Sequence, residues 1–136
     1  MEKTNLIIDT NVIVSAFLSS NENSPVSIIL FDLYKMKYNL FYSDLIFLEY
    51  KDVLNRPKFN FDKKEINQFL LFIKFYGIKI NPLSLRNVIM IDEKDRPFLE
   101  LFFEIKKFDS YLITGNLKHY PFDSNIVSPR IFIESL

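Results

Sequence analysis

The sequence predicts one α/β domain, a three-layer α/β/α sandwich around a central parallel sheet. The run Asn5–Ile8 is strand-like and apolar, which is typical of strands covered on both faces in parallel sheets. Further strand-like runs alternate with segments whose apolar residues recur at helical spacing, and short turns join them. Neither a repeat nor a linker interrupts this pattern, so residues 1–136 are expected to form a single domain.

Start and stop signals place the elements in order. N-caps are expected at Ser24, Ser43, Asp62 and Ser128, and Gly77 is expected to close a helix. Strands are expected at residues 5–8, 38–42, 78–80, 111–114 and 125–127, with a further extended piece at 88–91. Helices are expected from about 11, from 25 to 37, from 44 to 55, between 62 and 77, from the 92–97 segment to 106, and from 129.

The composition restricts the chemistry to carboxylates and amides. The chain has no Cys, which excludes thiol nucleophiles, disulfides and thiolate zinc sites, and its two glycines exclude a G-x-G-x-x-G turn or a P-loop. His119 is the single histidine, so a multi-histidine metal site is excluded too. Any metal is therefore expected to be a hard cation, Mg²⁺ or Mn²⁺, held by oxygen ligands.

The sequence indicates neither a membrane nor a secretory route. No apolar run approaches the roughly 20 residues that span a bilayer, and the start of the chain lacks a signal-peptide pattern. With the absence of Cys, this predicts a cytoplasmic protein. Lys plus Arg equals Asp plus Glu, so any attraction of nucleic acid must come from a local patch.

Asp9 lies where a buried strand is expected to meet the next element. In open parallel sheets, ligands bind in the crevice outside the carboxyl ends of the strands, which favours a functional Asp9. Thr10 and Asn11 follow directly as candidate supporting residues. Helix capping is the alternative, because Asp, Thr and Asn all accept bonds from free N–H groups.

Glu49 is expected on or beside the buried stripe of its helix, because Leu45, Ile46 and Val53 lie three or four positions away. A carboxylate on such a face carries a desolvation cost unless a positive group meets it. The alternatives are a salt bridge to Lys or Arg, or a metal ligand near Asp9.

Asp92 and Asp95 precede a predicted helix, where free N–H groups and the helix dipole favour anions. One of them is expected to cap the helix while the other reaches a cation in the crevice beside Asp9. Thr114 ends another expected strand, and Asn116 follows it. The Asn116 carbonyl is a weaker ligand for a hard cation, or belongs to an ordinary turn with the preceding glycine.

Convergent acids at several strand ends suit metal-assisted hydrolysis of phosphodiesters. One or two Mg²⁺ would lower the pKa of a water, orient it for attack and neutralise charge on the scissile phosphate. Lys118 and His119 are candidates to hold substrate phosphates, although two basic residues in a loop are also ordinary solvated surface.

Four motifs, in this order, resemble the PIN-domain family and in particular its VapC-like toxins. They are I-I-D-T-N-V at 7–12, Glu49 in a mid-chain helix, D-x-x-D-R-P-F-L at 92–99 and Y-L-I-T-G-N-L-K-H at 111–119. The resemblance covers essentially the whole chain. It implies an α/β/α fold and an Mg²⁺- or Mn²⁺-dependent endoribonuclease, commonly the toxin of a toxin–antitoxin pair.

By motif position, the resemblance implies Asp9, Glu49 and Asp95 as the metal-binding acids and Asn116 as a further catalytic-site residue. It also implies RNA as substrate, an antitoxin protein as partner and a homodimer. Many members have a fourth Asp where this chain has Asn116, so Asp92 or Asp109 would have to substitute for it.

Two other functions compete with this interpretation. A phosphohydrolase with Asp9 as nucleophile needs a second Asp two residues later, where this chain has Asn11. A degenerate PIN-like domain would bind RNA or a partner protein without cleavage, and the departure at Asn116 is its only support. Metal-dependent RNA cleavage separates the nuclease from both rivals.

Overall fold

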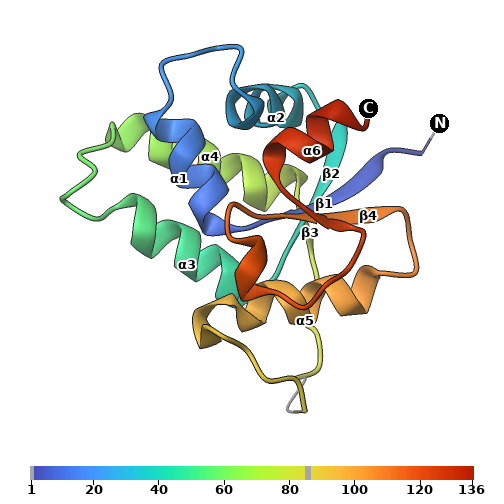
Figure 1. Cartoon of the computed structure of the whole chain (residues 1–136). Coiled ribbons are helices and arrows are strands. Elements are labelled where there is room, and N and C mark those ends of the chain that lie inside the picture. The colour runs from blue at the N-terminus through green and yellow to red at the C-terminus, as the bar shows by residue number, and fades with distance from the viewer. Residues whose placement is uncertain (1, 85–86) are drawn as a thin grey trace.

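The computed structural model describes residues 2–84 and 87–136 and has the predicted three-layer α/β/α architecture (Figure 1). Among these residues, five parallel strands form one sheet in the order β3-β2-β1-β4-β5. The strands are β1 (Thr4–Ile8), β2 (Tyr38–Tyr42), β3 (Ile78–Lys79), β4 (Ser110–Ile113) and β5 (Ile126–Val127). The chain leaves β1 toward one edge and later returns to its other side with β4, so the direction of winding reverses between these two strands.

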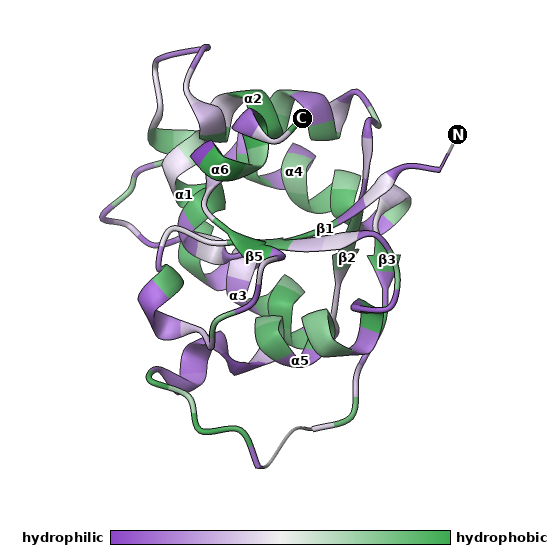
Figure 2. Ribbon diagram, turned by 45° about the vertical axis from the view of Figure 1, so that its right-hand side comes forward, coloured by the Kyte–Doolittle hydropathy of each residue, from purple (hydrophilic) through white to green (hydrophobic). Residues whose placement is uncertain are grey.

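Helices cover both faces of the sheet. Figures 1 and 2 place α2, α4 and α6 on one side and α5 on the other, while α1 and α3 begin directly after β1 and β2. The helices are α1 (Thr10–Leu18), α2 (Pro25–Tyr34), α3 (Asp44–Leu54), α4 (Lys63–Tyr76), α5 (Arg96–Ile105) and α6 (Pro129–Glu134), with the 3₁₀ turns η1 (Glu93–Asp95) and η2 (Leu117–His119). None of the helices in the described residues has the length and hydrophobicity needed to cross a membrane.

The predicted N-caps are in place. The hydroxyls of Ser24, Ser43 and Ser128 each accept a hydrogen bond from the N–H three residues on, at 3.2–3.3 Å. The Asp62 carboxylate accepts one from the Lys64 N–H at 2.8 Å. These bonds satisfy N–H groups that the first turn of a helix leaves without a partner, which explains why the helices begin at these residues.

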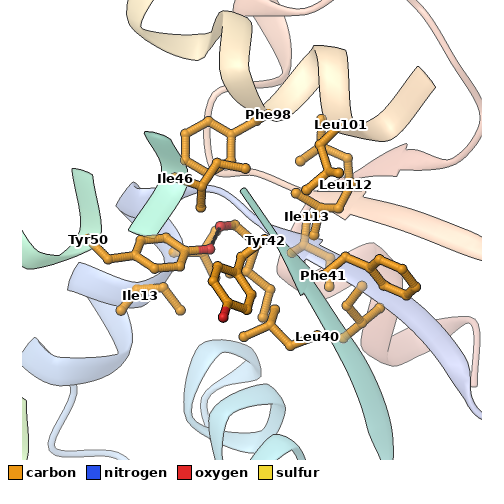
Figure 3. Packing of buried hydrophobic residues seen from close by; sticks show 14 of the residues in the cluster. Ile13, Leu40, Phe41, Tyr42, Ile46, Tyr50, Phe98, Leu101, Leu112 and Ile113 are labelled. Carbon is orange, nitrogen blue, oxygen red and sulfur yellow. Dashed lines mark hydrogen bonds between the residues drawn. The ribbon is translucent and has the colours of Figure 1, made fainter. Parts of the chain in front are cut away.

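Tyr50 of α3 connects the core to the end of β1. It is fully buried, and its ring packs 5.8 Å from the Phe69 ring of α4 and 6.3 Å from the Phe98 ring of α5. Its hydroxyl donates to the backbone carbonyl of Ile8, and Figure 3 shows the ring among the apolar side chains around that bond. Because Ile8 precedes Asp9 and Tyr50 follows Glu49, this contact fixes the backbone next to both acids.

The extended piece predicted at residues 88–91 does not form a strand. Residues 88–91 join no strand of the described sheet, and Ile89 and Ile91 are 96% and 75% exposed. The segment is held locally: Met90 is buried, and the Arg96 guanidinium donates to the Val88 carbonyl at 2.7 Å. Apolar composition alone therefore does not place a segment in the sheet.

Candidate active site

Asp9 follows β1 directly and is 3% exposed. Its Oδ2 accepts hydrogen bonds from the hydroxyls of Thr114 at 2.7 Å and Tyr120 at 3.0 Å, and from the Asn11 amide at 3.3 Å. Although Asp9 occupies the N-cap position of α1, its side chain makes no cap hydrogen bond. The capping alternative is therefore wrong, and the carboxylate is directed to the end of the neighbouring strand instead.

The residues after β4 lie beside Asp9 and hold the end of β1. Thr114, which bonds Asp9, also accepts the Asn116 N–H at 3.0 Å. The Gly115 N–H donates to Asn11 Oδ1 at 2.9 Å, and a Cβ at Gly115 would lie 3.1 Å from that oxygen. The ends of β1 and β4 are thus joined at the point where the strand order reverses, which is where open α/β sheets bind ligands.

Glu49 reaches the same crevice from α3. It is half-buried, and it accepts a hydrogen bond from the Thr10 hydroxyl of α1. Among the described residues, no Lys or Arg lies within ion-pairing distance of Glu49, and nearby Arg56 pairs with Asp52 at 3.3 Å instead. The salt-bridge alternative is not realised.

Asp92 has the capping role that was predicted for one of these two acids, and Asp95 does not. The Asp92 carboxylate caps η1 by accepting the Lys94 N–H at 3.0 Å. Asp95 makes no side-chain cap bond, is buried, and lies 3.0 Å from His119 Nδ1 through its Oδ2. Ligand atoms of Asp92, Asp95 and His119 all lie within 4.8 Å of one another, so these three residues are able to hold a metal ion.

Like charges and burial act together on the acids. Burial raises the pKa of Asp9, against the hydrogen bonds that it accepts. Burial, and then the negative charges of Asp9 and Asp95, raise the pKa of Glu49. Burial followed by the charge of Asp9 raises the pKa of Asp95, against the bond from His119. The charge of Asp9 therefore acts on both Glu49 and Asp95, and such coupling of buried acids is typical of a functional cluster.

The remaining predicted residues lie at the mouth of the crevice or away from it. Asn116 and Lys118 are exposed, and the Asn116 side chain makes no hydrogen bond with the described residues. Asp109 precedes β4, where it accepts the Thr4 hydroxyl at 3.3 Å. It is therefore at the opposite end of that strand from Thr114, and the prediction that it substitutes for a fourth acid is wrong.

Sequence reasoning missed Tyr50 and Tyr120. Tyr120 is 7% exposed and donates to Asp9 across 111 positions of sequence, and η2 brings it there. The only signal for it was its place directly after the 111–119 motif. Tyr50 lies next to Glu49 at a position where the helical pattern predicts burial. That pattern predicts core packing of Tyr50, but not the hydrogen bond from its hydroxyl to β1.

The fold and the site together define a parallel α/β protein with an acidic, metal-type site at the strand ends. The PIN domain family matches residues 5–118, and the chain belongs to that family. PIN domains are generally metal-dependent nucleases. A search of curated proteins found no match.

Proposed function

We propose that this PIN domain is an Mg²⁺- or Mn²⁺-dependent endoribonuclease whose metal is held by Asp9, Glu49 and Asp95. One observation carries the proposal: acids from the end of β1, from α3 and from the turn before α5 lie close enough at the reversal point of the sheet that burial and the charge of Asp9 raise the pKa of both Glu49 and Asp95. A bound cation removes that repulsion, because it is attracted to all three charges. The donors are oxygens with one imidazole beside them, a set that fits a hard divalent cation.

The cation would supply the Lewis acidity that activates a water and neutralises charge on the scissile phosphate. The chain's own residues orient the ligands. Thr114 and Tyr120 hold one oxygen of Asp9, and the Thr10 hydroxyl holds Glu49. Partners of this kind fix the orientation of a ligand before the metal arrives.

Lys118 is proposed to contact substrate phosphates at the rim. It is exposed on η2, one residue from His119, so an RNA backbone that approaches the acids passes close to it. A phosphate contact positions RNA without reading its sequence. Replacing Lys118 by Gln is therefore expected to weaken RNA binding equally for different sequences.

The biological role proposed is that of the toxin of a toxin–antitoxin pair, acting in the cytoplasm as a homodimer and inhibited by an antitoxin protein. These partners rest on the resemblance of the motifs to VapC-like proteins. Induced expression is expected to stop cell growth in the wild type and not in Asp9→Asn. Growth would resume when the product of a neighbouring gene is expressed with it, if that product is the antitoxin.

The test of the enzymatic proposal is cleavage of a structured RNA by the pure protein. Cleavage is expected with Mg²⁺ or Mn²⁺, none with EDTA, and none with Asp9→Asn purified in the same way, which controls for contaminating ribonucleases. RNA binding that persists without any cleavage would contradict the nuclease and support the degenerate binding domain. Cleavage that is unaffected by EDTA would contradict the metal mechanism.

A further inference from the structure

We propose that His119 is a nitrogen ligand of the metal site, and that it makes this site bind Mn²⁺ in preference to Mg²⁺. The proposal rests on the proposed function, because it assigns a further ligand to the same site. The three acids supply only oxygen donors. His119 would add a nitrogen donor, and with it a preference between the two cations.

The position of the imidazole fits a ligand. His119 Nδ1 lies 3.0 Å from Asp95 Oδ2, and one ligand atom from each of Asp92, Asp95 and His119 falls within a 4.8 Å span. Bonds from a divalent cation to its ligands are about 2.0–2.6 Å, so two ligand atoms on one cation are separated by at most about 4–5 Å. A cation bound to Asp95 therefore has His119 within reach.

The η2 turn holds His119 in this position from both sides. The His119 N–H donates to the Asn116 carbonyl at 2.9 Å, and the next residue, Tyr120, is anchored through its hydroxyl to Asp9. The side chain of His119 is 35% exposed, whereas that of Asp95 is 12% exposed. The imidazole is thus more accessible to solvent than the carboxylate that it contacts.

His119 and Asn116 belong to the same short turn. Asn116 is the N-cap of η2 and His119 is its last residue, three positions later. A 3₁₀ helix has three residues per turn, so side chains three positions apart lie on the same face. Asn116 itself has non-helical backbone angles and an exposed side chain, whereas His119 contacts Asp95, so His119 is the residue of this turn that reaches the acids.

A nitrogen ligand changes the preference of a site among hard cations. Mg²⁺ binds oxygen ligands and dehydrates reluctantly, while divalent transition metals accept imidazole as well as carboxylate. Mn²⁺ binds carboxylate oxygens as Mg²⁺ does, and it also accepts an imidazole nitrogen. Replacing one oxygen donor by imidazole therefore lowers the affinity for Mg²⁺ more than the affinity for Mn²⁺.

The decisive experiment is pulsed electron paramagnetic resonance of Mn²⁺ bound to tag-free protein labelled with ¹⁵N-histidine. Because the chain contains a single histidine, every histidine nitrogen signal comes from position 119. We expect a ¹⁵N coupling of the size of a directly bound imidazole, absent in His119→Gln. Mn²⁺ that binds to the wild type and is lost in Asp9→Asn, but shows no such coupling, would overturn the ligand proposal and leave the acidic metal site intact.

Calorimetric titration tests the cation preference. We expect the ratio of the Mg²⁺ and Mn²⁺ dissociation constants to fall by about tenfold in His119→Gln, within the range seen for residues that tune metal sites. His119→Asp should keep Mn²⁺ binding and also lose the preference, because it restores an oxygen donor. Asp62→Asn, which removes a charge from an exposed helix cap outside the site, is the control and should leave the ratio unchanged. An unchanged ratio in both His119 variants would overturn the proposal, and a wild type that binds neither cation would overturn the metal site itself.

Discussion

The two ends of the acidic site are built differently. Asp9 follows a central strand and receives three side-chain donors, from Thr114, Tyr120 and Asn11. Asp95 ends a 3₁₀ turn and has one side-chain partner, His119 on a second such turn. Short 3₁₀ turns have poorer hydrogen-bond geometry than α-helices. Asp9 is therefore a fixed anchor, and Asp95 is the part of the site that has room to adjust to a cation.

Removing the anchor should have the largest effect. Asp9→Asn keeps the shape of the side chain and removes its charge, so we expect RNA cleavage to fall by more than about 100-fold, above the 10–100-fold loss for residues that only orient ligands. Single-turnover cleavage at saturating Mn²⁺ measures it. Asp62→Asn removes a charge from an exposed helix cap and is the control. Asp9→Asn that cleaves at the wild-type rate would contradict the mechanism.

Removing one donor from the anchor should have the next largest effect. Tyr120→Phe deletes a buried hydroxyl that bonds Asp9 and leaves the ring in place. We expect Mn²⁺ affinity, measured by calorimetry, to fall by about tenfold, because the carboxylate loses a partner that both orients it and favours its charged form.

Thr10→Val is the matched comparison, because it deletes the hydroxyl that bonds Glu49 and preserves the shape of the side chain. Glu49 is half-buried and is able to replace the lost bond with water, so the loss in Mn²⁺ affinity should be smaller than for Tyr120→Phe. A larger loss in Thr10→Val would reverse the assignment of Asp9 as the anchor.

The difference between the two ends also explains what the sequence could predict. Asp9, Glu49 and Asp95 each carry a local signal: a strand end, a buried helix face and a position before a helix. The division of tasks between Asp92 and Asp95 carries none, because it depends on which carboxylate meets His119 from 24 positions away. The bond from Tyr120 likewise depends on the path of η2. Long-range partners of this kind are set by the packing of whole elements.

The pH dependence of stability is a third test of the anchor. Burial raises the pKa of Asp9 above its ordinary value of 3.8, so the folded state binds the proton more tightly than the unfolded state. Protonation of Asp9 therefore stabilises the folded state. This contribution to the free energy of unfolding is complete at pH values below 3.8 and is lost as the pH rises through the folded-state pKa. We therefore expect the metal-free protein to lose more stability than Asp9→Asn between about pH 4 and pH 8.

Thermal unfolding of both proteins in EDTA measures this difference. Mn²⁺ should raise the melting temperature of the wild type, by mass action on the folded state, and leave Asp9→Asn nearly unchanged. Parallel stability curves for the two proteins in EDTA would show that Asp9 does not carry the burial cost assigned to it.

The smallest effect is expected at the adjustable end, from Asn116→Asp. Asn116 is exposed and its side chain has no hydrogen-bond partner among the described residues, so an added charge interacts through solvent. Interactions between exposed charges are worth about 0.2–1 kcal/mol, which corresponds to at most about a fivefold gain in Mn²⁺ affinity.

If His119 already occupies the ligand position on that side of η2, the gain should be larger in the His119→Gln background than in the wild type. Calorimetry on the four proteins of this double-mutant cycle measures the difference. Equal gains in both backgrounds would mean that the two residues act independently, and that the turn does not present them to the same cation.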